Sequence, residues 1–315
     1  MNNSPFAILD LGTNTFHLLI VQKDTDRGWK RVFHRRITVK LGQGGIHKNE
    51  IAPAPFKRGL RALKQFRSYM DRYGVKQVRA FGTAALRNAT NGRIFIREAK
   101  KLYRIPIKLI SGDDEAGMIL KGVQQAVDIS SEKFLIMDIG GGSVEFIIAN
   151  NKELFFKKSF KLGAALLLES FQPEDPIKKA TLLAIQKHLE LALESLFDAI
   201  SLNKPISLIG SAGSFESFAS MIRHLYPESG SHYRKKSHII RLNHFNQLYS
   251  RLIFSTRSKR KQMRGLTSMR VDMIVMAAVL LKVVLQKSGI RKLYLSTYSL
   301  KEGAAAELFG NSKHK

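Results

Sequence analysis

Two short segments of the sequence place an aspartate just before a glycine-containing turn. Asp10 ends an apolar run and is followed by LGTNT, and Asp138 ends another and is followed by IGGGS. Consecutive backbone N–H groups in a tight turn form an anion-binding nest, and glycine lets the anion approach without a Cβ in the way. A carboxylate beside a phosphate is repulsive unless a divalent cation lies between them or the carboxylate orients a water. The two turns therefore predict a bound phosphoryl group with Mg²⁺ nearby.

The residues that follow each turn exclude two other phosphate-binding motifs. Neither turn ends in the GK[ST] of a P-loop. The run GGGSVEFIIA (140–149) continues as a strand rather than opening a helix, so it does not fit the dinucleotide-binding fingerprint. For either aspartate alone, a side chain that caps its own turn remains the structural alternative. The matching positions of the pair favour the phosphate interpretation.

The elements that must position these turns occur twice. Residues 7–20 (AILDLGTNTFHLLI) resemble residues 135–148 (LIMDIGGGSVEFII) position by position. Strand-like and helix-like periodicity predicts the same element order in each half. In the first half we expect strands at 5–10, 15–22, 29–39, 76–82 and 106–110, and helices at 53–72, 91–103 and 113–127. In the second half we expect strands at 132–138, 143–149, 152–160, 205–209 and 291–295, and helices at 163–200, 213–226, 243–256, 268–287 and 299–309.

This repetition predicts two related α/β domains. The first covers residues 1–125, and the second covers residues 126–315 with an insertion at about 227–290. The last helix, within 299–315, could pack back on the first domain. Two such halves imply a cleft between them, which is where ligands tend to bind.

Composition narrows the class of protein. Of the 315 residues 44% are hydrophobic and none is cysteine, which excludes a disulfide scaffold, a Cys-based zinc site and a thiol nucleophile. The net charge of +27 predicts attraction to a polyanion, with a general solubility role as the alternative. No signal peptide is apparent, and the apolar run at 273–281 is far shorter than the ~20 residues that span a bilayer. We expect a cytoplasmic protein that has no membrane partner.

Basic residues gather in several segments. Lys57, Arg61 and Lys64 have the i, i+4, i+7 spacing of one helical face. The others are YRKK (233–236), RSKRKQMR (257–264) and SKHK (312–315). Together they could hold a polyphosphate outside the cleft with a steep salt dependence, although any single cluster could be a solvated face. Single-stranded nucleic acid normally also requires aromatic stacking platforms, so it is disfavoured but remains an alternative.

Several segments, in order and across nearly the whole chain, resemble the exopolyphosphatase/guanosine pentaphosphate phosphohydrolase (Ppx/GppA) family. This family belongs to the actin, Hsp70 and sugar-kinase superfamily. The combination of ISGxxEA with DIGGGSxE is specific, whereas DLGTNT alone would indicate only the superfamily. The segments are AILDLGTNTFHLLI (7–20), VKLGQGG (39–45), FGTAALRNATN (81–91), LISGDDEAGMIL (109–120), MDIGGGSVEFII (137–148), KLGAALL (161–167), LIGSAGS (208–214), RGLTSMRVDMIVMAAVLL (264–281) and LKEG (300–303).

The resemblance implies an α/β fold with two duplicated actin-like (ribonuclease H-like) domains flanking an interdomain cleft. It implies release of terminal orthophosphate from inorganic polyphosphate, or of the 5′ terminal phosphate of pppGpp, with Mg²⁺ or Mn²⁺. The implied partners are inorganic polyphosphate and guanosine penta- or tetraphosphate, and a homodimer is a further expectation.

The resemblance also assigns roles to residues. Glu115 matches the catalytic glutamate of the family's ISGxEEA motif and is the expected general base. Asp138 and Glu145 match the acidic residues of the second glycine turn, where they would position metal or water, and Asp10 is a further metal candidate. Arg87, in the SALR-type motif, would hold a neighbouring phosphate. The expected phosphate-binding turn residues are Gly12, Thr13, Asn14, Thr15, Gly140, Gly141, Gly142 and Ser143.

Structural roles compete with two of these assignments. An acid at the start of a helix, such as Glu115, interacts favourably with the helix dipole whether or not it is catalytic. Arg87 could cap a helix or form a purely structural ion pair.

The chain departs from the family pattern in several places. Asp114 replaces a glutamate of the ISGxEEA motif, and Met269 replaces the glutamate of an ERxD-type run. GSAGS (210–214) is a looser version of GTGGT, and STYSLKEG (296–303) replaces the acidic and glycine residues that usually precede the family's LREG run. Longer members append C-terminal helical domains, which a chain ending at 315 is expected to lack. Two alternatives therefore stay open: a kinase or ATPase of the superfamily, and a non-catalytic phosphate-chain or nucleotide sensor.

Overall fold

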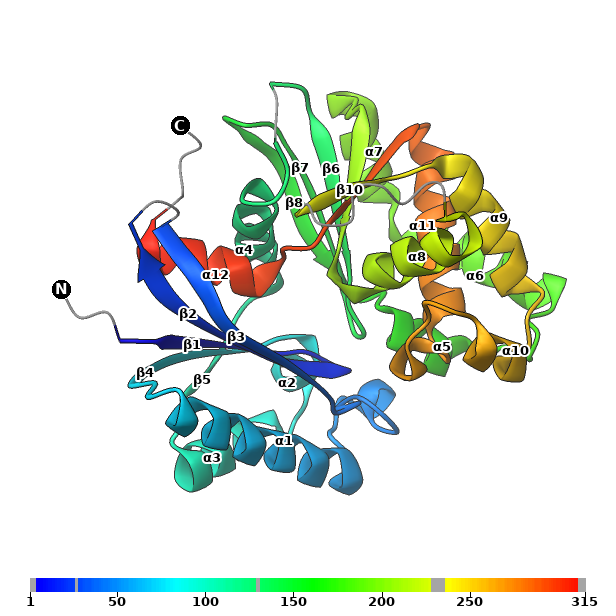
Figure 1. Ribbon diagram of the computed structural model, residues 1–315. Helices are drawn as coiled ribbons and strands as arrows, with labels where there is room; N and C mark the ends of the chain where they lie inside the picture. The colour runs from blue at the N-terminus through cyan, green and yellow to red at the C-terminus, as the bar shows by residue number, and fades with distance from the viewer. Residues whose placement is uncertain (1–3, 26–27, 129–130, 228–235, 311–315) are drawn as a thin grey trace. The chain divides into compact units, whose positions relative to one another are not determined.

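The chain divides into two compact units in a computed structural model that describes residues 4–25, 28–128, 131–227 and 236–310 (Figure 1). Unit 1 comprises residues 1–125 and 299–315, and unit 2 comprises residues 126–298. The helix after the last strand therefore belongs to unit 1. Among the described residues, no helix combines the length and the apolar character needed to cross a membrane.

Unit 1 is built on a five-stranded sheet in the order β3-β2-β1-β4-β5. The first three strands pair antiparallel, and β4 and β5 continue the sheet in parallel with β1. The strands are β1 (Phe6–Leu11), β2 (Thr15–Asp24), β3 (Gly28–Thr38), β4 (Gln77–Gly82) and β5 (Ile107–Leu109). Because helices cover both of its faces, the central strand β1 reads as a nearly continuous apolar run.

The helices of unit 1 form two layers. Figure 1 shows α1 and α3 on one face of the sheet and α4 with α12 on the other. The helices are α1 (Pro53–Arg72), α2 (Ala84–Asn88), α3 (Gly92–Tyr103), α4 (Gly112–Gln124) and α12 (Leu300–Phe309), with a 3-10 turn at Ile46–Lys48. The α12 backbone lies directly on the α4 backbone: a Cβ built on Gly303 would lie 1.8 Å from the carbonyl oxygen of Met118.

Unit 2 repeats the sheet order of unit 1 and adds one edge strand. Its order is β10-β11-β9-β6-β7-β8, so β8-β7-β6-β9-β11 corresponds to β3-β2-β1-β4-β5 with the same parallel and antiparallel pairings. The strands are β6 (Phe134–Ile139), β7 (Val144–Ala149), β8 (Leu154–Phe160), β9 (Ser207–Ser211), β10 (Ser237–Ile240) and β11 (Lys292–Ser296). The predicted duplicated α/β fold class is confirmed. The predicted cleft stays a prediction.

The helices of unit 2 pack around α11, which is apolar on nearly every side and buried along most of its length. The helices are α5 (Ala164–Phe171), α6 (Lys179–Ala192), α7 (Glu194–Asn203), α8 (Ala212–Leu225), α9 (Leu242–Ile253), α10 (Arg257–Gln262) and α11 (Ile274–Ser288), with a 3-10 turn at Ser268–Arg270.

Several predicted elements differ from the structure. The expected helix 163–200 is three helices, interrupted at 172–178, where Pro173 and Pro176 lie. The expected helices 243–256 and 268–287 are likewise shorter, since α9 ends at Ile253 and α11 begins at Ile274. The short elements α2 and β10 were not predicted, because a few residues carry too little periodicity. Residues 233–235 and 312–315 of the basic segments lie outside the described residues.

Candidate active site

The acidic residues of the second glycine turn lie side by side in the sheet of unit 2. Asp138 on β6 is paired directly with Glu145 on β7, and both side chains are buried, with 5% and 1% of their surface exposed. On the outer sides of this pair, Ser211 of β9 donates a hydrogen bond to Asp138 Oδ2, and Ser159 of β8 donates one to Glu145 Oε1 at 2.7 Å. We call Ser211, Asp138, Glu145 and Ser159 the acidic row.

Electrostatics makes the acidic row unusual for a sheet interior. Like charges directly opposite each other on neighbouring strands repel. A divalent cation between the two carboxylates would relieve this repulsion. Among the described residues, no cluster of three or more His, Cys, Asp or Glu side chains could hold a metal ion. Mg²⁺, however, is commonly held by one or two carboxylates together with waters and substrate phosphates, so the two acids of the row fit it.

The glycine turn between β6 and β7 is supported by the start of α5. The N–H of Gly140 donates to the carbonyl oxygen of Ser143 at 3.0 Å, which closes the turn. The N–H groups of Ala164 and Ala165 donate to the carbonyl oxygens of Gly140 and Gly141, both at 3.0 Å. The helix thus occupies the carbonyl side of the turn. In the part of the chain that the structure describes, the N–H groups of residues 141–143 have no backbone acceptor, as an anion-binding nest requires.

The glycine before α5 is explained by the same contact. A Cβ built on Gly163 would lie 2.3 Å from the carbonyl carbon of Gly141 and 2.4 Å from the nitrogen of Gly142. Only a residue without a side chain lets the helix come this close to the turn. The KLGAALL segment (161–167) therefore serves to hold the glycine turn in place.

The first glycine turn, in unit 1, has a similar shape but different neighbours. The N–H of Gly12 donates to the carbonyl oxygen of Thr15 at 3.1 Å, and Thr13 is buried. The carbonyl oxygen of Asn14 accepts from the N–H groups of residues 39 and 40, both at 2.9 Å, so the VKLGQGG segment braces this turn. Asp10 on β1 is paired with His17 on β2, whereas Asp138 at the matching position of unit 2 is paired with Glu145. The paired acids are therefore a feature of unit 2.

Glu115 lies in the first turns of α4, in unit 1. Ser111 caps this helix: its hydroxyl oxygen accepts from the N–H of Asp114 at 3.0 Å, and the Asp114 carboxylate accepts from Ser111 in return. The shorter acid at position 114 therefore completes a capping box with Ser111. Glu115, one residue later, is buried, with 8% of its surface exposed.

Arg87 contacts Glu115 directly. Its Nη1 donates to Glu115 Oε2 at 3.0 Å and to the carbonyl oxygen of Ile110 at 2.8 Å. The arginine lies in the last turn of the short helix α2 and fixes one oxygen of the glutamate. The structure thus brings two of the predicted site residues together within unit 1, and it shows Arg87 bound to Glu115.

The GSAGS loop begins α8 and carries two unusual features. Ala212 has φ 64°, a left-handed conformation that normally favours glycine. A Cβ on Gly213 would lie 1.4 Å from Nη2 of Arg270, so the glycine makes room for this guanidinium. Sequence reasoning singled out the loop and Met269 but missed Arg270. It also missed the roles of the two serines of the acidic row: Ser211 lies within GSAGS but was given no role, and the sequence signal of Ser159 is a hydroxyl residue near a strand end.

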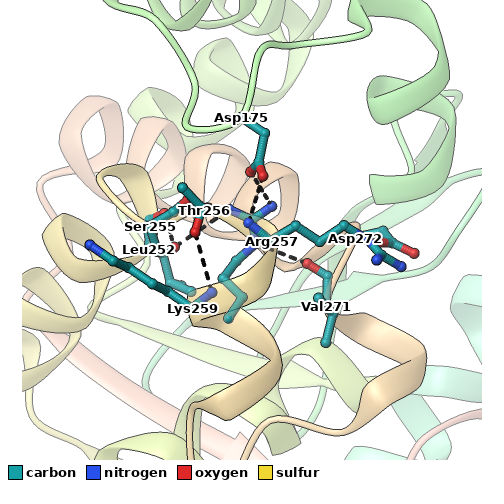
Figure 2. A network of polar contacts seen from close by, with 9 residues as sticks. Asp175, Leu252, Ser255, Thr256, Arg257, Lys259, Val271 and Asp272 are labelled. Atoms are coloured by element: carbon teal, nitrogen blue, oxygen red, sulfur yellow. Dashed lines mark hydrogen bonds and ion pairs between the residues drawn. The ribbon is translucent and has the colours of Figure 1, made fainter.

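Part of the basic segment 257–264 is used within unit 2 (Figure 2). Arg260 is buried and binds Asp175 Oδ1 at 2.8 Å and the carbonyl oxygens of residues 255 and 271. The N–H of Arg257 donates to Asp175 Oδ2, and its Nε contacts Asp272 Oδ1, both at 2.6 Å. The hydrogen bond that Arg257 donates to the Asp272 carboxylate raises the pKa of Arg257. This network ties the segment that carries Arg270 to α10 and to the loop before α6.

Comparison with known proteins identifies related chains. The model of the Ppx/GppA phosphatase family matches residues 19–311. An exopolyphosphatase from Cytophaga hutchinsonii of known structure is 37% identical, with a TM-score of 0.94, over 97% of this chain and 98% of that one. A Ppx/GppA family member from Aquifex aeolicus, 19% identical with a TM-score of 0.79, shares the fold over 99% of both chains.

Curated relatives are longer than this chain. A guanosine-5′-triphosphate,3′-diphosphate pyrophosphatase from Aeromonas salmonicida is 26% identical over 99% of this chain and 61% of its own length. A bifunctional 3-dehydroquinate synthase/phosphatase from Fusobacterium nucleatum is 29% identical over 91% of this chain and 44% of its own length. The chain therefore spans less than two thirds of either protein.

Proposed function

Because the chain belongs to the Ppx/GppA phosphatase family, we propose that it hydrolyses terminal phosphoanhydride bonds, with inorganic polyphosphate as the first substrate and pppGpp as the second. The observation that carries this proposal is the 37% identity to an exopolyphosphatase over 97% of the chain. The acidic row and the paired Glu115 supply suitable chemical groups. Polyphosphate is placed first because the exopolyphosphatase from Cytophaga hutchinsonii matches over 98% of its own length, whereas the guanosine-5′-triphosphate,3′-diphosphate pyrophosphatase from Aeromonas salmonicida matches over 61% of its length.

Each group has a distinct task in this proposal. Glu115 is the general base that accepts a proton from the attacking water. The water oxygen bonds to the terminal phosphorus as the bond from that phosphorus to the bridging oxygen breaks. Orthophosphate leaves, and the chain is one phosphate shorter. Arg87 orients the Glu115 carboxylate through the 3.0 Å contact and can also face a substrate phosphate.

The acidic row and the glycine turns serve binding. Asp138 and Glu145 would hold Mg²⁺ or Mn²⁺, which would neutralise charge on the phosphate chain. Asp10 is a further metal candidate. The N–H groups of residues 141–143, with the Ser143 hydroxyl and the turn 12–15, would contact phosphate oxygens. Cytoplasmic localisation and homodimer formation stay predictions from the sequence.

Phosphate release with polyphosphate, pppGpp or ATP as substrate, in the presence of Mg²⁺, tests the proposal. Glu115→Gln should lower the rate by roughly 10²–10⁴-fold, the usual contribution of a general base. Asp113→Asn is the matched control, because Asp113 is an exposed acid on the same helix, and we expect little change. Equal rates for wild type and Glu115→Gln would remove Glu115 from the mechanism. If only ATP is turned over, a kinase or ATPase is favoured. If polyphosphate or pppGpp binds but is not hydrolysed, a non-catalytic sensor is favoured.

A further inference from the structure

One surface of unit 1 carries a concentration of positive charge. It is the outward side of helices α1 and α3, which lie together on one face of the sheet (Figure 1). Eight exposed cations make up this surface, which we call the α1–α3 basic face. They are Lys57, Arg61, Lys64, Arg93, Arg97, Lys100, Lys101 and Arg104.

The packing of the two helices explains why these cations share one surface. The inward side of α1 buries Leu63 and Phe66, and that of α3 buries Phe95. Phe95 lies against Gly59, where a Cβ would meet its ring at 2.7 Å. The missing side chain lets the helices approach closely. The polar residues of both helices must then point outward together.

On α3 the cations form a continuous row. Arg93, Arg97, Lys100 and Lys101 are spaced i, i+4, i+7 and i+8, which places them on one side of the helix over about 12 Å. Arg104 directly follows the last residue of the helix. Within the described residues, none of the eight side chains of the basic face forms an ion pair or a side-chain hydrogen bond. Their charges are therefore not neutralised by neighbouring residues.

The concentration is local and does not simply follow from the high net charge. Helix α1 carries six Lys or Arg residues and one acidic residue, and α3 carries four Lys or Arg residues and one acidic residue. In unit 2, the exposed helix α6 carries two Lys residues and one acid, and α7 carries no cation and two acids. Helix α10 carries four cations, but two of them, Arg257 and Arg260, form ion pairs with Asp272 and Asp175. A general solubility role predicts cations spread over all exposed helices. The asymmetry instead points to a partner of opposite charge.

We propose that the α1–α3 basic face binds the part of a long inorganic polyphosphate chain that lies beyond the reacting end. The identity of this ligand rests on the proposed function. Charge on the face is dense, and every aromatic side chain of the two helices is buried or half-buried. A face without exposed rings has no stacking platform for bases, which disfavours single-stranded nucleic acid. A chain made only of phosphates needs only cations.

Binding measurements in EDTA test this inference without turnover, because the metal needed for hydrolysis is removed. The probes are long-chain polyphosphate, tripolyphosphate and a single-stranded RNA of comparable charge. The face variant is the triple substitution Arg97→Gln, Lys100→Gln and Lys101→Gln. The control variant loses the same charge from three exposed lysines of unit 2. These are Lys152, Lys179 and Lys187.

The expected result is a change in salt dependence. Each phosphate contact on a single strand contributes about 0.7 to the slope of log affinity against log salt, so losing three contacts lowers the slope by about 2. Between about 50 and 200 mM salt, wild type should then lose roughly 20-fold more affinity for long chains than the face variant. The control should behave as wild type, and tripolyphosphate affinity should change less than long-chain affinity.

Other outcomes would overturn the inference. Equal losses in the face and control variants would mean that net charge alone attracts the chain. RNA bound through this face as tightly as polyphosphate would make nucleic acid the occupant. The fluorescence of Trp29, buried in unit 1, checks that the face variant is folded. A protein that binds long polyphosphate through this face but releases no orthophosphate would preserve this inference and refute the proposed function.

Discussion

Substituting Gly303 by alanine should loosen the contact between the helix that carries Glu115 and the last helix of the chain. A Cβ at this position would lie 1.8 Å from the carbonyl oxygen of Met118 and 3.0 Å from the nitrogen of Gly122, whereas ordinary contacts begin at 3.4 Å. All these neighbours are backbone atoms, so no side chain can rotate away and α12 must move by roughly 1.5 Å. Overpacking of this kind lowers the free energy of unfolding by up to about 3 kcal/mol, and the higher helix propensity of alanine raises it by about 1 kcal/mol. We expect the free energy of unfolding to fall by about 2 kcal/mol in total.

Gly117→Ala is the matched control on α4. Nothing lies within 4 Å of a Cβ at this position, so the same substitution should stabilise the helix by up to about 1 kcal/mol. Urea unfolding followed by Trp29 fluorescence measures both variants. Trp29 is the single tryptophan, and it is buried in β3 of unit 1. The two variants should differ by about 3 kcal/mol in the free energy of unfolding. If Gly303→Ala unfolds at the same urea concentration as wild type, the inference that the α4 and α12 backbones are in direct contact at Gly303 is wrong.

Two further predictions concern unit 2. Replacing Ser159 or Ser211 by alanine removes the hydroxyl that holds Glu145 or Asp138, and we expect roughly 10–100-fold weaker binding of Mn²⁺, measured directly by titration. Unchanged Mn²⁺ affinity in both variants would separate the serines from metal binding. Ala212→Gly should raise the free energy of unfolding by up to about 1 kcal/mol, because Ala212 has φ 64°. Calorimetry checks this, and a lower melting temperature would contradict the inferred strain.

Local signals were sufficient for most of the fold. The repeated strand–turn–strand at 7–20 and 135–148 predicted two related sheets, because alternation and glycine turns are short-range features. Prediction failed where an element was short, as with β10, or where prolines interrupted a long apolar segment, as at 172–178. The sequence indicated the packing of α12 on unit 1 only as one possibility, because this packing depends on a contact with Met118, which is far away in the sequence.

The candidate site was predicted as a set of residue types, and its internal geometry was not. The motifs indicated Glu115, Arg87 and the acids of the second turn. They did not indicate that Arg87 binds Glu115, because these residues lie on different elements and meet through tertiary packing. The expectation that both glycine turns contact one phosphate stays a prediction.

By itself, the amino-acid sequence determined the duplicated α/β plan, the two glycine turns and the excess of cations, since each depends on residue type and local spacing. Only the tertiary structure decided which side chains become neighbours. Sheet register placed Ser159 and Ser211 on either side of the buried acids, and helix packing gathered the cations of α1 and α3 on one surface. Register and helix packing are set by contacts between residues far apart in the chain, and local sequence patterns do not encode those contacts.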